Sequence, residues 1–162
     1  PIYLMSLPPR DVTHIYDYYQ LGLNEVAFNI EIYDRKIASE IMPGKGKIPI
    51  SAYINALEES TKYFGKTGNV RSMLIVGLEP EESLLNGIKA LCAIGVSPML
   101  SIYRPMPLTP MKHIVPPMIT DIKSIFWKSQ NICKQHALPL GPLCDQCQNN
   151  TLSLPSYYSA IT

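Results

Sequence analysis

The chain has 162 residues, 46% of them hydrophobic, and a formal net charge of +1 with acidic and basic residues interspersed. This composition suffices for one buried core and argues against a disordered chain or a coiled coil. The balanced charge provides no extended basic surface for nucleic acid, and no apolar run approaches the roughly 20 residues of a membrane span. We therefore expect a cytoplasmic protein of about one domain, without nucleic-acid or membrane partners.

Short apolar runs alternate along the chain with segments of helical periodicity, a pattern typical of βα units around a parallel sheet. The strands are predicted at 2–6, 25–31, 70–76 and 96–103, and the helices at roughly 13–21, 35–42, 51–64, 80–94 and 119–136. The predicted fold class is α/β: a partial (β/α) barrel with about four parallel strands, then a C-terminal helix and an irregular tail with candidate metal ligands. We divide the chain into a half-barrel at 1–118 and a helix with its tail at 119–162.

Two local patterns between the second and third strands give specific expectations. In the helix at 51–64, Ile54, Leu57, Thr61 and Phe64 share one stripe, which predicts the buried face. The Pro-Gly-Lys-Gly-Lys segment at 43–47 is predicted to be a loop.

The second strand carries polar residues where a buried strand is usually apolar. Its alternation places Val26, Phe28 and Ile30 on one face and leaves Asn29 and Glu31 on the other. A buried strand rarely points two polar groups inward without a ligand or partner for them. We therefore predict a ligand contact at Asn29 and Glu31.

Three stretches together resemble the radical S-adenosylmethionine (SAM) superfamily, and within it the branch around biotin synthase. They are Glu-Val-Ala-Phe-Asn-Ile-Glu at 25–31, Ser-Met-Leu-Ile-Val-Gly-Leu-Glu at 72–79 and Leu-Ser-Ile-Tyr-Arg-Pro at 100–105. The match runs from about Ile2 to Thr109. The resemblance implies that the complete protein cleaves SAM to methionine and a 5′-deoxyadenosyl radical, which takes hydrogen from a small-molecule or peptide substrate.

The resemblance also implies which residues bind the cofactor. Asn29 and Glu31 would contact the ribose hydroxyls, since a carboxylate accepts two hydroxyl protons at once. The glycine-containing segment at 75–78 would flank adenine, together with Ile102. Arg104 follows the last strand directly, and from this position we expect it to meet the SAM carboxylate or an anionic substrate. The predicted cofactor-binding set is Asn29, Glu31, Ile75, Gly77, Leu78, Ile102 and Arg104.

The sequence departs from the family pattern in several places. The Cys-x3-Cys-x2-Cys loop that holds the [4Fe-4S] cluster is absent, so we expect the cluster on residues outside this chain and assign no catalytic residue here. The Gly-Gly-Glu segment that holds the SAM amino group is absent too. Met73 replaces an expected glycine, Glu79 lies one place earlier than the usual acid, and Tyr53 stands where a basic residue is expected.

The first predicted strand has a consequence for assembly. If Ile2–Ser6 is the third strand of the family's barrel, its outer edge exposes unpaired backbone groups and apolar side chains. We expect a missing N-terminal half or a complementing chain to pair with this edge, or the isolated chain to self-associate.

Near the C-terminus, Cys133, His136, Cys144 and Cys147 form a C-x2-H-x7-C-x2-C pattern. Two pairs of such ligands can close a tetrahedral zinc site. An auxiliary iron-sulfur cluster, a redox dithiol, and a core Cys133 with an exposed His136 and incidental thiols are the alternatives. Two other functions also stay open: a non-catalytic metal-binding or interaction protein, and a barrel fragment that binds phosphate or a nucleotide through Lys45 and Lys47.

Overall fold

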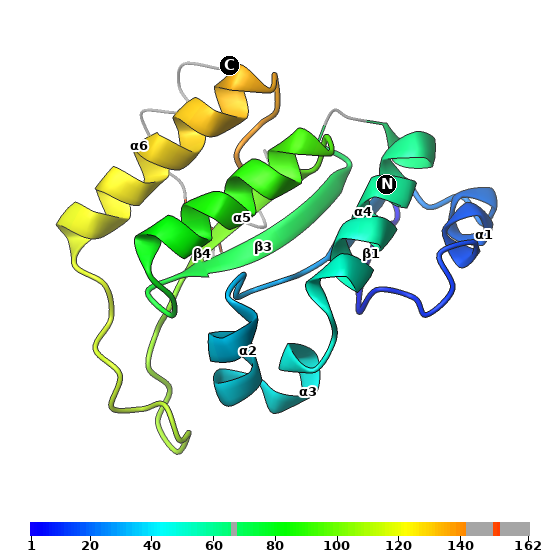
Figure 1. Cartoon of the computed structure of the whole chain (residues 1–162). Helices are drawn as coiled ribbons and strands as arrows, with labels where there is room; N and C mark the ends of the chain where they lie inside the picture. Colours follow the sequence, from blue (N-terminus) through cyan, green and yellow to red (C-terminus); the bar gives the residue numbers. More distant parts are fainter. Residues whose placement is uncertain (66–67, 142–150, 153–162) are drawn as a thin grey trace.

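The structure, a computed structural model, describes residues 1–65, 68–141 and 151–152 (Figure 1). One sheet contains four parallel strands in the order β1-β2-β3-β4, which confirms the predicted fold class. The strands are β1 (Tyr3–Ser6), β2 (Glu25–Phe28), β3 (Val70–Val76) and β4 (Ser97–Ile102). The helices are α1 (His14–Gln20), α2 (Arg35–Ile41), α3 (Pro43–Gly46), α4 (Ile50–Phe64), α5 (Glu81–Ala93) and α6 (Ile119–Gln135).

The core lies between the sheet and the helices that cover one of its faces (Figure 1). β3 shows the alternation most clearly, because Val70, Leu74 and Val76 are buried against the helices. α5 buries a stripe of Leu84, Ile88 and Leu91. The consecutive strand order, with the connecting helices on one face, is that of a barrel segment and positions the carboxyl ends of all four strands together.

The predicted buried face of α4 is wrong by part of a turn. The helix buries Tyr53, Ala56, Leu57, Ser60 and Phe64, whereas Ile54 and Thr61 are only partly buried. Ser60 tolerates burial because its hydroxyl donates a hydrogen bond to the Ala56 carbonyl at 2.7 Å, within the helix. Leu57 and Phe64 are thus buried as predicted, but the buried face is turned toward Tyr53, Ala56 and Ser60 and away from Ile54 and Thr61.

The loop predicted at 43–47 is also wrong, since Pro43–Gly46 forms the short helix α3. A Cβ on Gly46 would lie 2.4 Å from the Ala38 carbonyl oxygen, so glycine allows α3 to pack directly on α2. Arg35 of α2 holds the two helices together, because it donates hydrogen bonds to the carbonyls of Lys45 in α3 at 2.8 Å and of Ile48 just after α3 at 3.1 Å.

The two edges of the sheet differ. No residue of the described ranges pairs with the outer side of β1, where Met5 and Leu7 are half exposed. At the other edge, the Gly141 N–H donates to the Pro98 carbonyl at 2.7 Å and the Leu152 N–H donates to the Leu100 carbonyl at 2.6 Å. None of the helices found over 1–65 and 68–141 is long and apolar enough to span a bilayer.

Candidate functional site

The hydrogen-bond ladder between β2 and β3 is interrupted just where β2 ends. The Ser72 hydroxyl fills the interruption: it donates to the Phe28 carbonyl at 2.8 Å and accepts from the Ile30 N–H at 3.1 Å. Pairing resumes at Glu31, whose N–H donates to the Met73 carbonyl at 2.8 Å. The interruption is therefore local and lies at the edge where a barrel of this kind binds its ligands.

Asn29 lies within this interruption and is buried, with 6% of its surface exposed. Its side-chain oxygen Oδ1 accepts a hydrogen bond from the Met73 N–H at 3.1 Å. The oxygen thus satisfies a backbone donor that a regular ladder would have paired. The sequence contains no signal for this structural role. Because the side-chain oxygen of Asn29 is engaged by Met73, its side-chain NH2 group is the one suited to a ligand.

Glu31 ends the strand in a left-handed backbone conformation, with φ of 65°. Its carboxylate forms an ion pair with the Lys45 Nζ, and both side chains are partly exposed. Glu31, which is predicted to bind the ribose, therefore already has a cationic partner, Lys45 of α3. Lys47, the second lysine of that segment, is exposed to solvent.

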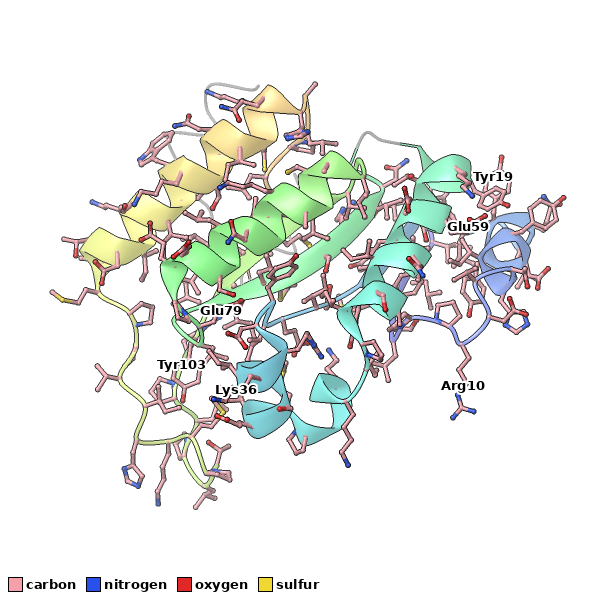
Figure 2. The ribbon with its side chains drawn as sticks, in the orientation of Figure 1. Arg10, Tyr19, Lys36, Glu59, Glu79 and Tyr103 are labelled. Atoms are coloured by element: carbon pink, nitrogen blue, oxygen red, sulfur yellow. The ribbon has the colours of Figure 1, made fainter. Side chains whose placement is uncertain are left out.

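Glu79 joins the segment after β2 to the beginning of α5, where Figure 2 labels it. Its carboxylate accepts hydrogen bonds from the N–H groups of Tyr33 at 2.8 Å and Asp34 at 2.9 Å, and from the Ser83 hydroxyl at 2.6 Å. This contact holds in place the segment that carries Glu31. The sequence marks Glu79 only as a displaced family acid, because the two backbone donors on Tyr33 and Asp34 lie 46 and 45 residues away in the chain.

Tyr53 and Arg35 pack together beneath Glu31. The Tyr53 side chain is completely buried, and no residue of the described ranges hydrogen-bonds its hydroxyl. The Arg35 guanidinium lies 5.7 Å from the centre of its ring. Burial raises the pKa of Tyr53 above its ordinary value; the Arg35 charge opposes this rise and the Glu31 charge adds to it.

Replacing Tyr53 by phenylalanine is expected to stabilise the protein by about 1 kcal/mol at neutral pH, because it removes a buried hydroxyl without a partner. Because the pKa of Tyr53 is raised in the folded state, ionisation of this hydroxyl costs the protein no stability below about pH 10. As the pH rises from there through the pKa of the folded state, the free energy of unfolding falls. The variant should lose less stability than the wild type above about pH 10. Urea unfolding as a function of pH measures both effects, with Tyr16→Phe on the surface as the control; a destabilised Tyr53→Phe would show that the hydroxyl has a partner.

A pocket of about 440 Å³ lies at the carboxyl ends of β3 and β4. Its lining brings together three of the predicted residues, Ile75, Ile102 and Arg104, with Ser101, Tyr103 and Met106. Ile75 is paired in register with Ser101, and its N–H donates to the Glu31 carbonyl at 2.9 Å. Glu31 itself is in register with Leu74, so its backbone lies one residue before the level of Ile75 and Ser101 at these neighbouring strand ends.

Gly77 and Leu78 follow β3 but do not line this pocket. Gly77 has a φ of 100°, and a Cβ added there would lie 2.6 Å from the Pro117 Cδ. Both facts require glycine. The group that requires glycine at this position is a proline ring of the chain itself, and the contact of the 75–78 segment with adenine stays a prediction.

Two of the four predicted metal ligands, Cys133 and His136, lie within the residues that the structure describes. Cys133 is fully buried, with its Sγ 3.8 Å from the Cys92 Sγ, and the hydrogen bond to Cys92 and burial together raise its pKa. His136 is exposed at the end of α6, and Cys144 and Cys147 lie outside the described residues. Within the ranges that the structure describes, no group of three or more His, Cys, Asp or Glu residues is placed to hold a metal ion. The zinc or iron-sulfur site at these residues stays a prediction.

The open sheet of parallel strands, with helices on one face, is a fold found in radical SAM enzymes. It is similar to coproporphyrinogen III oxidase (HemN) from Escherichia coli, described as a radical SAM enzyme, with a TM-score of 0.63 and 13% sequence identity over 83% of this chain and 32% of that chain. In sequence, the chain is 32% identical over 111 residues to bacteriochlorophyllide c C-7(1)-hydroxylase of Chlorobaculum limnaeum, a match that covers 68% of this chain and 28% of the hydroxylase. No protein-family profile matches the chain. The chain thus spans less than a third of the length of either protein, and the assignment to the biotin-synthase branch stays a prediction.

Proposed function

We propose that this chain is the later part of a radical SAM enzyme, and that it binds the nucleoside of SAM along the carboxyl ends of β2, β3 and β4. The observation that supports this most is the pocket that Ile75, Ile102 and Arg104 line, together with the hydrogen bond from the Ile75 N–H to the carbonyl of Glu31 on the neighbouring strand. A carboxylate at one end and apolar side chains at the other fit a ribose joined to a flat base.

The neighbouring contacts define what each group does in this proposal. The Glu31 carboxylate accepts the ribose hydroxyls and shares its charge with Lys45. Asn29 acts as a donor through its amide, because Met73 already occupies its oxygen. Ile75 and Ile102 pack against adenine, and Arg104 binds the carboxylate of the amino-acid part.

The chemistry itself would come from bound SAM and a [4Fe-4S] cluster on residues outside this chain. Within the proposal, the chain orients the nucleoside and keeps water from the pocket. We also propose that the sheet continues at the outer side of β1, where the unpaired edge and the half-exposed Met5 and Leu7 favour further parallel strands.

For the substrate we propose a tetrapyrrole. The name of the hydroxylase specifies a bacteriochlorophyllide, and that protein is 32% identical to this one over 68% of this chain. The matched part is too small a share of the hydroxylase to transfer its reaction, so the proposal extends only to the chemical class of the substrate.

Calorimetric titration with SAM tests the nucleoside site. Wild-type chain is expected to bind SAM, and Glu31→Gln and Asn29→Ala are each expected to weaken binding about tenfold, equivalent to about 1.4 kcal/mol. Glu40→Gln, an exposed acid on α2, is the control for a lost charge and should leave the affinity unchanged. Absence of SAM binding, or equal affinities of all four proteins, would contradict the proposal.

A further inference from the structure

The segment between β4 and α6, residues 104–118, projects from the carboxyl end of the sheet beyond α2 (Figure 1). We call it the 104–118 projection. Its outer surface is apolar: Leu108 is 98% exposed and Val115 is 81% exposed. The other exposed apolar side chains here are Met106, Ile114, Met118 and the adjoining Ile119. This is a concentration of apolar surface that the described chain leaves uncovered.

Specific contacts hold the projection in shape, so its exposure does not come from fraying. Near its base, where Figure 2 labels Tyr103, the Tyr103 hydroxyl donates to the Met111 carbonyl at 2.6 Å. Within it, the Thr109 hydroxyl donates to the Met106 carbonyl at 2.8 Å. At its far end, Pro117 packs against Gly77. The apolar side chains are therefore presented to solvent by an anchored backbone.

The charge of the projection is entirely of one sign. Arg104 and Lys112 are basic, His113 follows them, and the sequence has no Asp or Glu between Glu82 and Asp121. Lys112 and His113 are exposed. An apolar surface with basic groups and no acids complements a ligand that is itself apolar and carries carboxylates.

The projection is continuous with the pocket of the proposed nucleoside site, because Arg104 and Met106 line that pocket. A ligand held on the projection would thus lie beside the group bound in the pocket. A membrane surface also attracts apolar and basic side chains, but it would not need this continuity. The position next to the pocket favours a substrate.

We propose that the 104–118 projection is the substrate-docking surface of this protein, and that its ligand is a tetrapyrrole with free carboxylates. Leu108 and Val115 pack against the ring, and Lys112 pairs with a carboxylate. The choice of ligand rests on the substrate class proposed above, whereas the docking surface rests on the exposure, anchoring and charge of the projection.

Titration with chlorin e6, a tetrapyrrole with three carboxylates, tests this on the whole 162-residue chain. Absorption and fluorescence of the chlorin report binding. The double variant Leu108→Ser, Val115→Ser is expected to bind at least about tenfold more weakly, by loss of apolar contact area. Lys112→Gln is expected to bind severalfold more weakly at low salt and to lose part of the salt dependence.

Matched controls exist elsewhere on the surface. Leu21→Ser removes an apolar side chain that is 74% exposed, and Lys123→Gln removes an exposed charge on α6. Both should bind chlorin e6 as the wild type does. Circular dichroism confirms that each variant is folded.

The outcomes separate this inference from the proposed function. Loss of chlorin binding in the projection variants, with SAM affinity unchanged, supports the inference; failure of SAM binding alone overturns only the proposed function. Wild-type chain that does not bind the chlorin, or projection variants equal to the Leu21→Ser and Lys123→Gln controls, would overturn the docking surface. So would phosphatidylglycerol vesicles that bind the chain through Leu108 and Val115, since the surface would then be a membrane contact.

Discussion

Replacing Glu79 by alanine is expected to lower the free energy of unfolding by about 2–3 kcal/mol, because it leaves two backbone donors without a charged acceptor. The same change should weaken SAM binding, since Tyr33 and Asp34 lie on the segment that follows Glu31. Urea denaturation measures the first effect and calorimetry the second. Both effects arise from one carboxylate that contacts no ligand in the proposed site.

Two companion variants show whether the hydrogen bonds are responsible. Glu79→Gln retains one side-chain oxygen as an acceptor and should recover part of the stability. Glu82→Ala removes an exposed acid from the first turn of α5, which begins just after Glu79, and should change stability by less than about 0.5 kcal/mol. If Glu79→Ala is no more harmful than Glu82→Ala, the carboxylate does not hold the segment.

Gly77→Ala is expected to destabilise the protein by about 3 kcal/mol, because the new methyl group meets the Pro117 ring and the backbone must keep a left-handed conformation. The variant should also release one end of the 104–118 projection. Increased proteolytic cleavage within 104–118, measured before global unfolding, would report that release.

The two causes can be separated with other glycines of the chain. Gly22 has a φ of 85° and no atom within 4 Å of an added Cβ, so Gly22→Ala tests the backbone strain alone, about 1 kcal/mol. Gly44 lies in α3 with neither constraint, and Gly44→Ala should be neutral or slightly stabilising. Equal effects at Gly77 and Gly22 would mean that the contact with Pro117 contributes nothing.

The parallel sheet could be predicted from sequence because its strands are short apolar runs separated by helical periodicity. β3 matches its predicted range, and β2 differs only beyond Phe28, where Ser72 and Asn29 replace the backbone ladder. Such a break depends on a polar residue of the neighbouring strand. Periodicity within one strand does not contain that information.

The candidate site was predictable only in part. Ile75, Ile102 and Arg104 line one pocket, and Asn29 and Glu31 lie near the adjoining strand end, whereas the contacts of all five with SAM stay a prediction. The cationic partner of Glu31 comes from α3, which the sequence suggested was a loop, and the Glu79 contacts join distant segments. Tertiary contacts determine these features, so local propensity could not reveal them.

The unequal edges of the sheet limit how copies of this chain can aggregate. Gly141 and Leu152 already bond to the backbone of β4, so among the described residues β1 is the edge without a partner. Two molecules joined through β1 would be related by a twofold axis, and the backbone groups of each β1 edge would then be paired with the other. Growth by strand addition would then stop at a closed pair and would not propagate into a fibril.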